Sequence, residues 1–246
     1  MSQPLLSLLG EIRAPGEWVA GFSPMPLLPR GDRHQVLVIP GLGTGDSATL
    51  PLRWRLKGLG YGVRGWGLGL NRGMRPHVVQ HLMRTLHALH DASGPVSIVG
   101  WSLGGIFARE MARKAPEQVR QVISLGSPFG GSNGTNIERL VQLVTGKGFS
   151  PQDDRKRTRL LTPPPVPSTA IYSKTDGLVD WRECVECQTP LTDNIGIYSS
   201  HGGLCGHPLA HFAIADRLAQ PADDWQPFHR AGWRALAYGD SRWGTL

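Results

Sequence analysis

Continuous apolar runs closed by glycine or proline alternate along the chain with stretches in which apolar positions recur about every 3.6 residues. The first run, QVLVIP at 35–40, ends in a glycine-rich turn, which is typical of a strand buried on both faces. Such alternation predicts a mostly parallel sheet with helices on both faces. Further strands are expected at 61–68, 96–99, 119–125, 168–172 and 195–198, and helices at 50–60, 76–91, 103–114 and 208–219.

Residues 126–167 interrupt this alternation. They contain glycines, the helix-like stretch NIERLVQLV, a charged cluster at 153–159 and a run of three prolines. We interpret them as a small cap or lid insertion within one α/β domain spanning residues 1–246, a length common for a single domain of this class. The apolar stretch LLSLLG at 5–10 is expected to form the edge of a packed N-terminal helix.

Composition and charge exclude several classes of protein. A hydrophobic content of 40% with 18% charged residues fits a soluble protein with a sizeable core. Since no run of 18 apolar residues occurs, a transmembrane helix is not expected, and the N-terminus lacks the basic region and cleavage site of a secretory signal. The net charge is +7, but no basic stripe with interleaved aromatic residues occurs, so a nucleic-acid partner is not expected.

The pattern G-x-S-x-G occurs twice, at 100–104 and at 130–134. The first copy follows the strand 96–99 directly and opens the helix 103–114, as a nucleophile elbow requires. There the backbone N–H of Leu103, at the helix N-terminus, can donate to a developing oxyanion. The second copy lacks this context and resembles a loop. Ser102 is therefore the candidate nucleophile, and Ser132 is not.

A serine nucleophile needs a base that is itself oriented by a carboxylate. The loop after the strand 168–172 holds two candidate carboxylates, Asp176 and Asp180. The loop after the last strand holds His201, whereas His207 precedes a proline and His211 lies within the final predicted helix. Position therefore favours His201 as the base.

Several segments together resemble an α/β-hydrolase of the bacterial lipase and esterase type. This resemblance covers most of residues 35–220 and strengthens the choice of Asp176, which matches the family's Asp-Gly-x-Val pattern better than Asp180 does. The matching segments are VIPGLGTGD at 38–46, GWGLGLN at 65–71, GWSLGG at 100–105, LGSPFGGS at 125–132, YSKTDGLVDW at 172–181 and SHGGL at 200–204.

The resemblance implies a serine hydrolase that cleaves carboxylic esters without a metal or an organic cofactor. In it Ser102 is the nucleophile, Asp176 the acid and His201 the base, while the backbone N–H of Leu42 joins that of Leu103 in an oxyanion hole. Many lipases have His-Gly where this chain has Pro40-Gly41, but the donor is a backbone amide and does not depend on that side chain.

The implied substrate is a small-molecule or lipid ester, so peripheral contact with a membrane stays open. Two alternatives also stay open: an acyltransferase that uses the same triad, and a binding protein that keeps the fold without catalysis. The sequence does not determine the acyl-chain length or the oligomeric state.

The chain contains three cysteines, Cys184, Cys187 and Cys205. The pair Cys184-x-x-Cys187 resembles half a zinc site, but no second CxxC or histidine pair completes it, so no metal is expected. A disulfide from Cys205 to either of the other two is an alternative that would favour a periplasmic or secreted protein. The odd count and the missing signal favour reduced thiols and a cytoplasmic enzyme.

Overall fold

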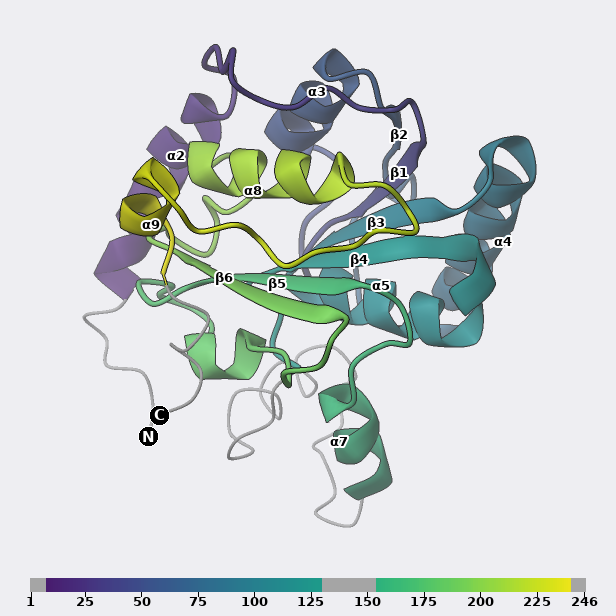
Figure 1. Cartoon of the computed structure of the whole chain (residues 1–246). Coiled ribbons are helices and arrows are strands. Elements are labelled where there is room, and N and C mark those ends of the chain that lie inside the picture. Colours follow the sequence, from purple (N-terminus) through teal and green to yellow (C-terminus); the bar gives the residue numbers. More distant parts are fainter. Residues whose placement is uncertain (1–7, 130–153, 240–246) are drawn as a thin grey trace.

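The computed structural model describes residues 8–129 and 154–239. Its strands form one sheet in the order β2-β1-β3-β4-β5-β6, and all neighbouring strands are parallel, as the alternating pattern predicts (Figure 1). The strands are β1 (Gln35–Ile39), β2 (Gly62–Arg64), β3 (Val96–Trp101), β4 (Val119–Leu125), β5 (Ser168–Ser173) and β6 (Thr192–Ile197).

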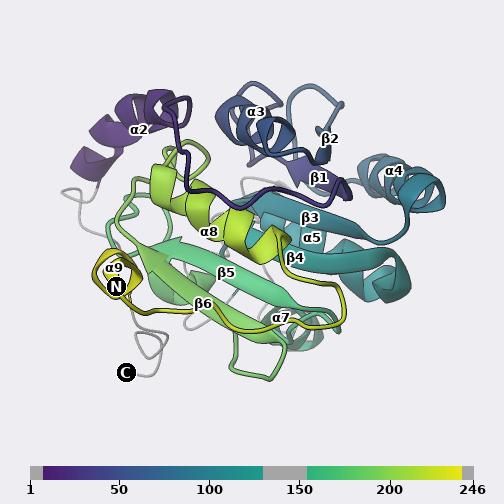
Figure 2. The same ribbon diagram turned by 45° about the horizontal axis from the view of Figure 1, so that its top comes forward.

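Helices cover both faces of the sheet. α3 (Leu50–Gly58) and α8 (Pro208–Leu218) lie on one face, and α4 (Pro76–Ser93) and α5 (Leu103–Lys114) lie on the other (Figure 2). None of the helices in the described ranges is both long and apolar enough to cross a lipid bilayer. The remaining elements are η1 (Leu9–Arg13), α2 (Ala14–Ala20), η2 (Pro116–Gln118), α7 (Asp154–Leu161), η3 (Trp181–Cys184) and α9 (Trp233–Ala237).

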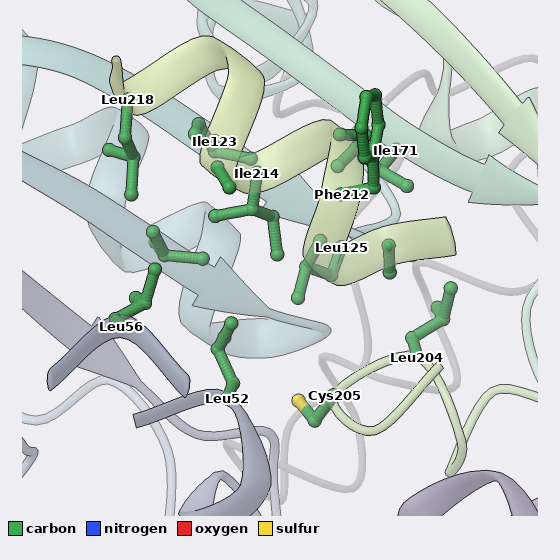
Figure 3. Packing of buried hydrophobic residues seen from close by; sticks show 14 of the residues in the cluster. Leu52, Leu56, Ile123, Leu125, Ile171, Leu204, Cys205, Phe212, Ile214 and Leu218 are labelled. Atoms are coloured by element: carbon green, nitrogen blue, oxygen red, sulfur yellow. The ribbon is translucent and has the colours of Figure 1, made fainter. Parts of the chain in front are cut away.

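Two hydrophobic cores result because successive side chains of a strand point to opposite faces. In β1, Val36 and Val38 belong to the core under α3 and α8, while Leu37 and Ile39 belong to the core under α4 and α5. Burial of each such side chain contributes about 1.5–3 kcal/mol, so both faces stabilise the sheet. Figure 3 shows the first core, in which α8 packs against α3 through residues that include Leu52, Leu56, Ile214 and Leu218.

The strand predicted at 61–68 is shorter than expected. β2 ends at Arg64 because the carboxylate of Asp46 accepts the backbone N–H groups of Trp66 (2.8 Å) and Gly67 (2.9 Å). These bonds divert residues 65–67 from the sheet into a loop beside the turn that follows β1. Glycine-rich spacing alone could not reveal this, since the acceptor lies about 20 residues earlier in the chain.

The predicted insertion is described only in part. The helix-like stretch at 136–144 and Ser132 lie outside the described residues. The charged cluster, for which the sequence pattern predicted no particular element, forms helix α7. Arg109 of α5 contacts the segment between α7 and β5. Its guanidinium donates to the carbonyls of Leu160 (2.8 Å) and Thr162 (3.1 Å) and forms a buried ion pair with Glu186.

The N-terminal segment differs from the packed helix edge that was expected. Residues Leu9–Arg13 form a 3₁₀ turn and α2 follows directly, but the Leu9 and Ile12 side chains are 60% and 75% exposed. This segment contacts the protein through polar side chains, including Glu11 and Glu17.

The three cysteines are free thiols in separate places. Cys205 lies in the core beneath α8 (Figure 3), Cys184 packs with Tyr172 and Val179, and Cys187 is exposed. Burial raises the pKa of the Cys184 and Cys205 thiols well above their usual range. Cys205 thus lies in a different hydrophobic cluster from Cys184, and the structure contains no disulfide among these three residues.

We predict that one thiol of the native protein reacts rapidly with a chromogenic disulfide reagent and that three react after unfolding without reductant. Cys187 is the expected fast thiol because the other two are buried and stay protonated near neutral pH. A Cys187→Ser variant serves as the control and should lose the fast phase alone. A count of one thiol in the unfolded protein would contradict the prediction.

Candidate active site

The loops that carry the candidate residues share one edge of the sheet. Ser102 follows β3 immediately, Asp176 lies in the loop after β5, and His201 lies in the loop after β6. Since all strands are parallel, their carboxyl ends meet at the same edge, where ligands bind in sheets of this kind.

Ser102 occupies a strained turn between β3 and α5. Its backbone angles are φ 53° and ψ −121°, and among the described non-glycine residues only Arg33 also has a positive φ. Such a conformation costs on the order of 1–3 kcal/mol and persists only where the surroundings fix it. The Ser102 N–H donates to Leu125 O (2.8 Å) and its carbonyl accepts from Gly105 N (3.0 Å), so the turn is held on both sides.

Two glycines let the strand, the turn and the helix approach closely. A Cβ atom on Gly100 would collide with the backbone of Gly104, and a Cβ on Gly104 would collide with the carbonyl of Ile39 at the end of β1. The spacing of the motif thus reflects packing of backbone against backbone. Any larger residue at either position would force the serine out of its turn.

Asp176 and His201 form a buried hydrogen-bonded pair. Asp176 Oδ2 lies 2.7 Å from His201 Nδ1, and Asp176 Oδ1 accepts the backbone N–H groups of Leu178 (2.9 Å) and Val179 (2.8 Å). An ionised carboxylate can only accept, so Nδ1 of His201 is the donor in this hydrogen bond. Asp180 instead caps η3 by accepting from Arg182 N (3.0 Å).

The end of β4 brings the pair next to the serine. Gly126 has a φ of +54°, and a Cβ built on it would lie 3.2 Å from His201 Nδ1 and 3.3 Å from Asp176 Oδ2. The preceding residue, Leu125, accepts the N–H of Ser102. The nucleophile candidate and the acid–base pair therefore lie on either side of one short backbone segment.

Trp101 makes a second link between the serine turn and the histidine loop. Its indole Nε1 donates to the His201 carbonyl (3.0 Å), and the two rings lie 5.6 Å apart. On the other side of the turn, a Cβ on Gly41 would lie 3.2 Å from the Cβ of Ser102. The loop after β1 consequently lies directly against the serine.

Two backbone amides at the site have no acceptor among residues 8–129 and 154–239. Neither the N–H of Leu42 nor that of Leu103 donates to any residue in the described ranges. Leu103 opens α5, whose N-terminus carries a partial positive charge, and Leu42 follows Gly41. Both amides are thus available to a ligand oxygen beside Ser102.

Asn71 fixes the loop that presents Leu42. Its side-chain Nδ2 donates to Pro40 O (2.8 Å), its backbone N–H donates to Thr44 O (2.7 Å), and its carbonyl accepts from Gly43 N (2.9 Å). Asn71 is fully buried. Sequence reasoning did not single out this residue, although it closes the matching segment GWGLGLN.

The rival histidines have structural partners. His207 caps α8, accepting from Leu209 N (3.2 Å), and His211 Nε2 lies 2.8 Å from the carbonyl oxygen of Cys205. His211 is fully buried, and this burial lowers its pKa to about 4. Both residues therefore belong to the packing of α8.

A second serine–histidine–aspartate arrangement occurs at the opposite edge of the sheet. His34 Nε2 lies 2.8 Å from Ser97 Oγ, and His34 Nδ1 contacts Asp32 Oδ1, while Arg120 also donates to Asp32 (2.7 Å). Ser97 is fully buried near the start of β3, where the pairing with β4 shifts by one residue, and its φ is not positive. Without a strained turn or access to a substrate, this group is a structural network.

Two glutamates near the site had no sequence signal. Glu11 and Glu17 of the N-terminal segment accept hydrogen bonds from the loops that carry Asp176 and His201. The contact between Glu11 and Gly177 spans 166 positions of sequence, so no local pattern could reveal it.

No protein-family model matches the chain. Among solved structures it is similar to one from work on LipS and LipT, two metagenome-derived lipolytic enzymes, with a TM-score of 0.58 and 15% identity over 78% of this chain and 94% of that one. It is also similar to Paleococcus ferrophilus monoacylglycerol lipase, with a TM-score of 0.56 and 16% identity over 78% of this chain and 96% of that one.

A third similar structure is the metagenomic carboxyl esterase MGS0156, with a TM-score of 0.55 and 15% identity over 79% of this chain and 77% of that one. Together with the parallel six-stranded sheet, these similarities confirm the predicted α/β-hydrolase fold.

We predict that His211 makes the protein less stable in acid. Its pKa in the folded state is about 4, below the ordinary 6.5, so the unfolded chain binds the proton more tightly. Stability from this group is complete above about pH 6.5 and declines as the pH falls towards 4, by about 3 kcal/mol in total. Urea unfolding at several pH values measures the change.

His211→Gln provides the matched control, because its amide can still donate to Cys205 O but does not titrate. The variant should be less stable than wild type near pH 7, and the difference should shrink as the pH falls to 4. A difference that is the same at both pH values would contradict the assignment.

Proposed function

We propose that the protein is a serine hydrolase that cleaves carboxylic esters through an acyl-enzyme on Ser102. The strained backbone of Ser102 is the observation that carries this proposal, since a non-glycine residue in this conformation between a strand and a helix is costly and typical of a nucleophile elbow. The buried Asp176–His201 pair and the two amides without an acceptor support it.

Acylation begins when Ser102 Oγ attacks the ester carbonyl carbon. His201 Nε2 accepts the hydroxyl proton, and Asp176 stabilises the imidazolium through the Nδ1 hydrogen bond. The negative charge that develops on the carbonyl oxygen is stabilised by the N–H groups of Leu42 and Leu103. When the carbon–oxygen bond of the alcohol breaks, His201 returns the proton to the leaving alcohol.

Deacylation repeats the same steps with water. His201 removes a proton from the water molecule, whose oxygen attacks the acyl carbon, and the proton then returns to Ser102 as the acid leaves. Every group that this cycle needs belongs to the chain, so the proposed mechanism uses no metal or organic cofactor.

The similar structures agree with this chemistry. Their names describe lipolytic enzymes, a monoacylglycerol lipase and a carboxyl esterase, all on this fold. One fold hosts many activities, so the proposal is argued from the residues of the site. The similarity in fold is consistent with it but does not establish the activity.

We predict that Ser102→Ala lowers the hydrolysis of p-nitrophenyl esters by about 10⁴-fold or more, because the nucleophile is removed. The variant should also fail to react with a fluorophosphonate probe. Ser132→Ala, which changes the second G-x-S-x-G copy, serves as the matched control and should keep most of the activity and labelling.

Equal hydrolysis by wild type and Ser102→Ala would refute the proposal. A wild-type protein that labels at Ser102 but transfers its acyl group to an added alcohol in preference to water would be an acyltransferase with the same triad. A folded wild-type protein that neither labels nor hydrolyses esters would be a binding protein on this fold.

We further predict that Asp176→Asn lowers kcat by about 10³- to 10⁴-fold, because the amide no longer fixes the productive histidine tautomer. Asp180→Asn should leave kcat close to that of wild type, since Asp180 caps η3 and an asparagine can also cap. Steady-state kinetics on one p-nitrophenyl ester compares the two. The reverse ranking would make Asp180 the acid.

A further inference from the structure

The N-terminal segment lies against the two loops that carry the acid and the base. Glu11 in η1 and Glu17 in α2 are partly buried, although neighbouring apolar side chains of the same segment are exposed. Both carboxylates point towards the protein, whereas the Leu9, Ile12 and Val19 side chains are exposed. Partly buried carboxylates of this kind need specific hydrogen-bond partners.

Glu11 has backbone partners in both loops. Its Oε1 accepts from Gly177 N (2.9 Å) and from His201 N (2.8 Å), and its Oε2 accepts from Gly202 N (3.1 Å). Gly177 directly follows Asp176. One carboxylate therefore holds the base itself and the residue adjacent to the acid, through charge-assisted hydrogen bonds.

Three successive backbone amides of the acid loop donate to two carboxylates. The amide of Gly177 donates to Glu11, and the amides of Leu178 and Val179 donate to Asp176 Oδ1. Glu11 thus continues the network by which Asp176 orients its own loop. A rotation of this loop that moved Asp176 away from His201 would break the bond to Glu11.

Glu17 acts on the base loop alone. Its Oε2 accepts from the Ser200 backbone N–H (2.9 Å), from the Ser200 hydroxyl (2.5 Å) and from the Ser199 hydroxyl (3.1 Å). The Ser200 hydroxyl in turn accepts from Gly203 N (3.0 Å). Glu17 binds the two residues that precede His201, whereas Glu11 is shared between the two loops.

Arg13 completes the contact from the same segment. Its guanidinium donates to Thr175 Oγ1 (3.0 Å) and Thr175 O (3.3 Å), and its Nε lies 3.9 Å from Glu17 Oε1. Arg13 is largely exposed, so these bonds contribute less than those of the glutamates.

We propose that Glu11 is a positioning residue that fixes the position of the Asp176–His201 pair relative to Ser102. The inference rests on the proposed function, since this position matters only if the pair acts on the serine. Glu11 touches neither the substrate nor a reacting atom. It acts by fixing the distance between the loop that follows β5 and the loop that follows β6.

The test compares Glu11→Ala and Glu11→Gln with Ile12→Ala as the matched control, because Ile12 is adjacent and its side chain is 75% exposed. Glu11→Ala should lower kcat for p-nitrophenyl acetate about 10- to 100-fold, with KM within about twofold, since a small misplacement of the base slows the chemical step. Glu11→Gln should recover most of the loss, because its amide oxygen can replace Oε1. Ile12→Ala should match wild type.

A second readout does not depend on turnover. The hydrogen-bonded Nδ1 proton of His201 should give a downfield proton resonance in wild type, Glu11→Gln and Ile12→Ala. In Glu11→Ala it should broaden or shift as the loops move. The thermal unfolding of each variant is measured, so that kinetics are compared only among folded proteins. If Glu11→Ala does not fold, Glu11→Asp replaces it, because its shorter side chain keeps the charge but cannot reach both loops.

Wild-type kcat and an unchanged resonance in folded Glu11→Ala would overturn the positioning role, as would a loss that Ile12→Ala reproduces. If Glu11→Ala does not fold, a folded Glu11→Asp variant with a lower kcat and a broadened or shifted resonance would support the role, and wild-type values of both would overturn it. A wild-type protein that shows the resonance but neither hydrolyses esters nor labels at Ser102 would refute the proposed function instead.

Discussion

The strained turn at Ser102 is the constraint on which the site depends. The serine has a φ of 53° because β3 runs into α5 without a linker, and the backbone has to reverse within one residue. The cost, on the order of 1–3 kcal/mol, is offset only because the neighbouring strands fix the turn. Leu125 at the end of β4 accepts the serine N–H, and Gly104 packs on Ile39 at the end of β1.

The acid and base loops have no regular structure and are held by carboxylates. Asp176 accepts two amides of its own loop and faces His201, while Glu11 accepts one amide of the acid loop and two of the base loop. Backbone amides compensate the desolvation of these anions. The carboxylates in turn hold both loops in place, together with apolar side chains such as Val179 and Leu204 that belong to the hydrophobic clusters.

The two serine–histidine–aspartate groups show what distance alone leaves undecided. His34 lies within hydrogen-bonding distance of both Ser97 and Asp32, yet Ser97 lies at the amino end of β3 and is fully buried. Ser102 lies at the carboxyl end of the same strand, beside a helix N-terminus and two amides that have no acceptor within the described part of the chain. Backbone strain and available donors, rather than the trio of residue types, distinguish the candidate site.

The sequence by itself determined the order of strands and helices, the parallel sheet and the three candidate residues, because periodicity and the positions of loops after strands are local properties. It could not determine that β2 ends at Arg64 or that the charged cluster forms α7, since Asp46 and Arg109 act from distant positions. Only the tertiary structure revealed Asn71 behind the Leu42 loop and Glu11 between the loops that carry Asp176 and His201. A hydrogen bond that spans 166 residues leaves no pattern in a single sequence, because the fold alone brings its two ends together.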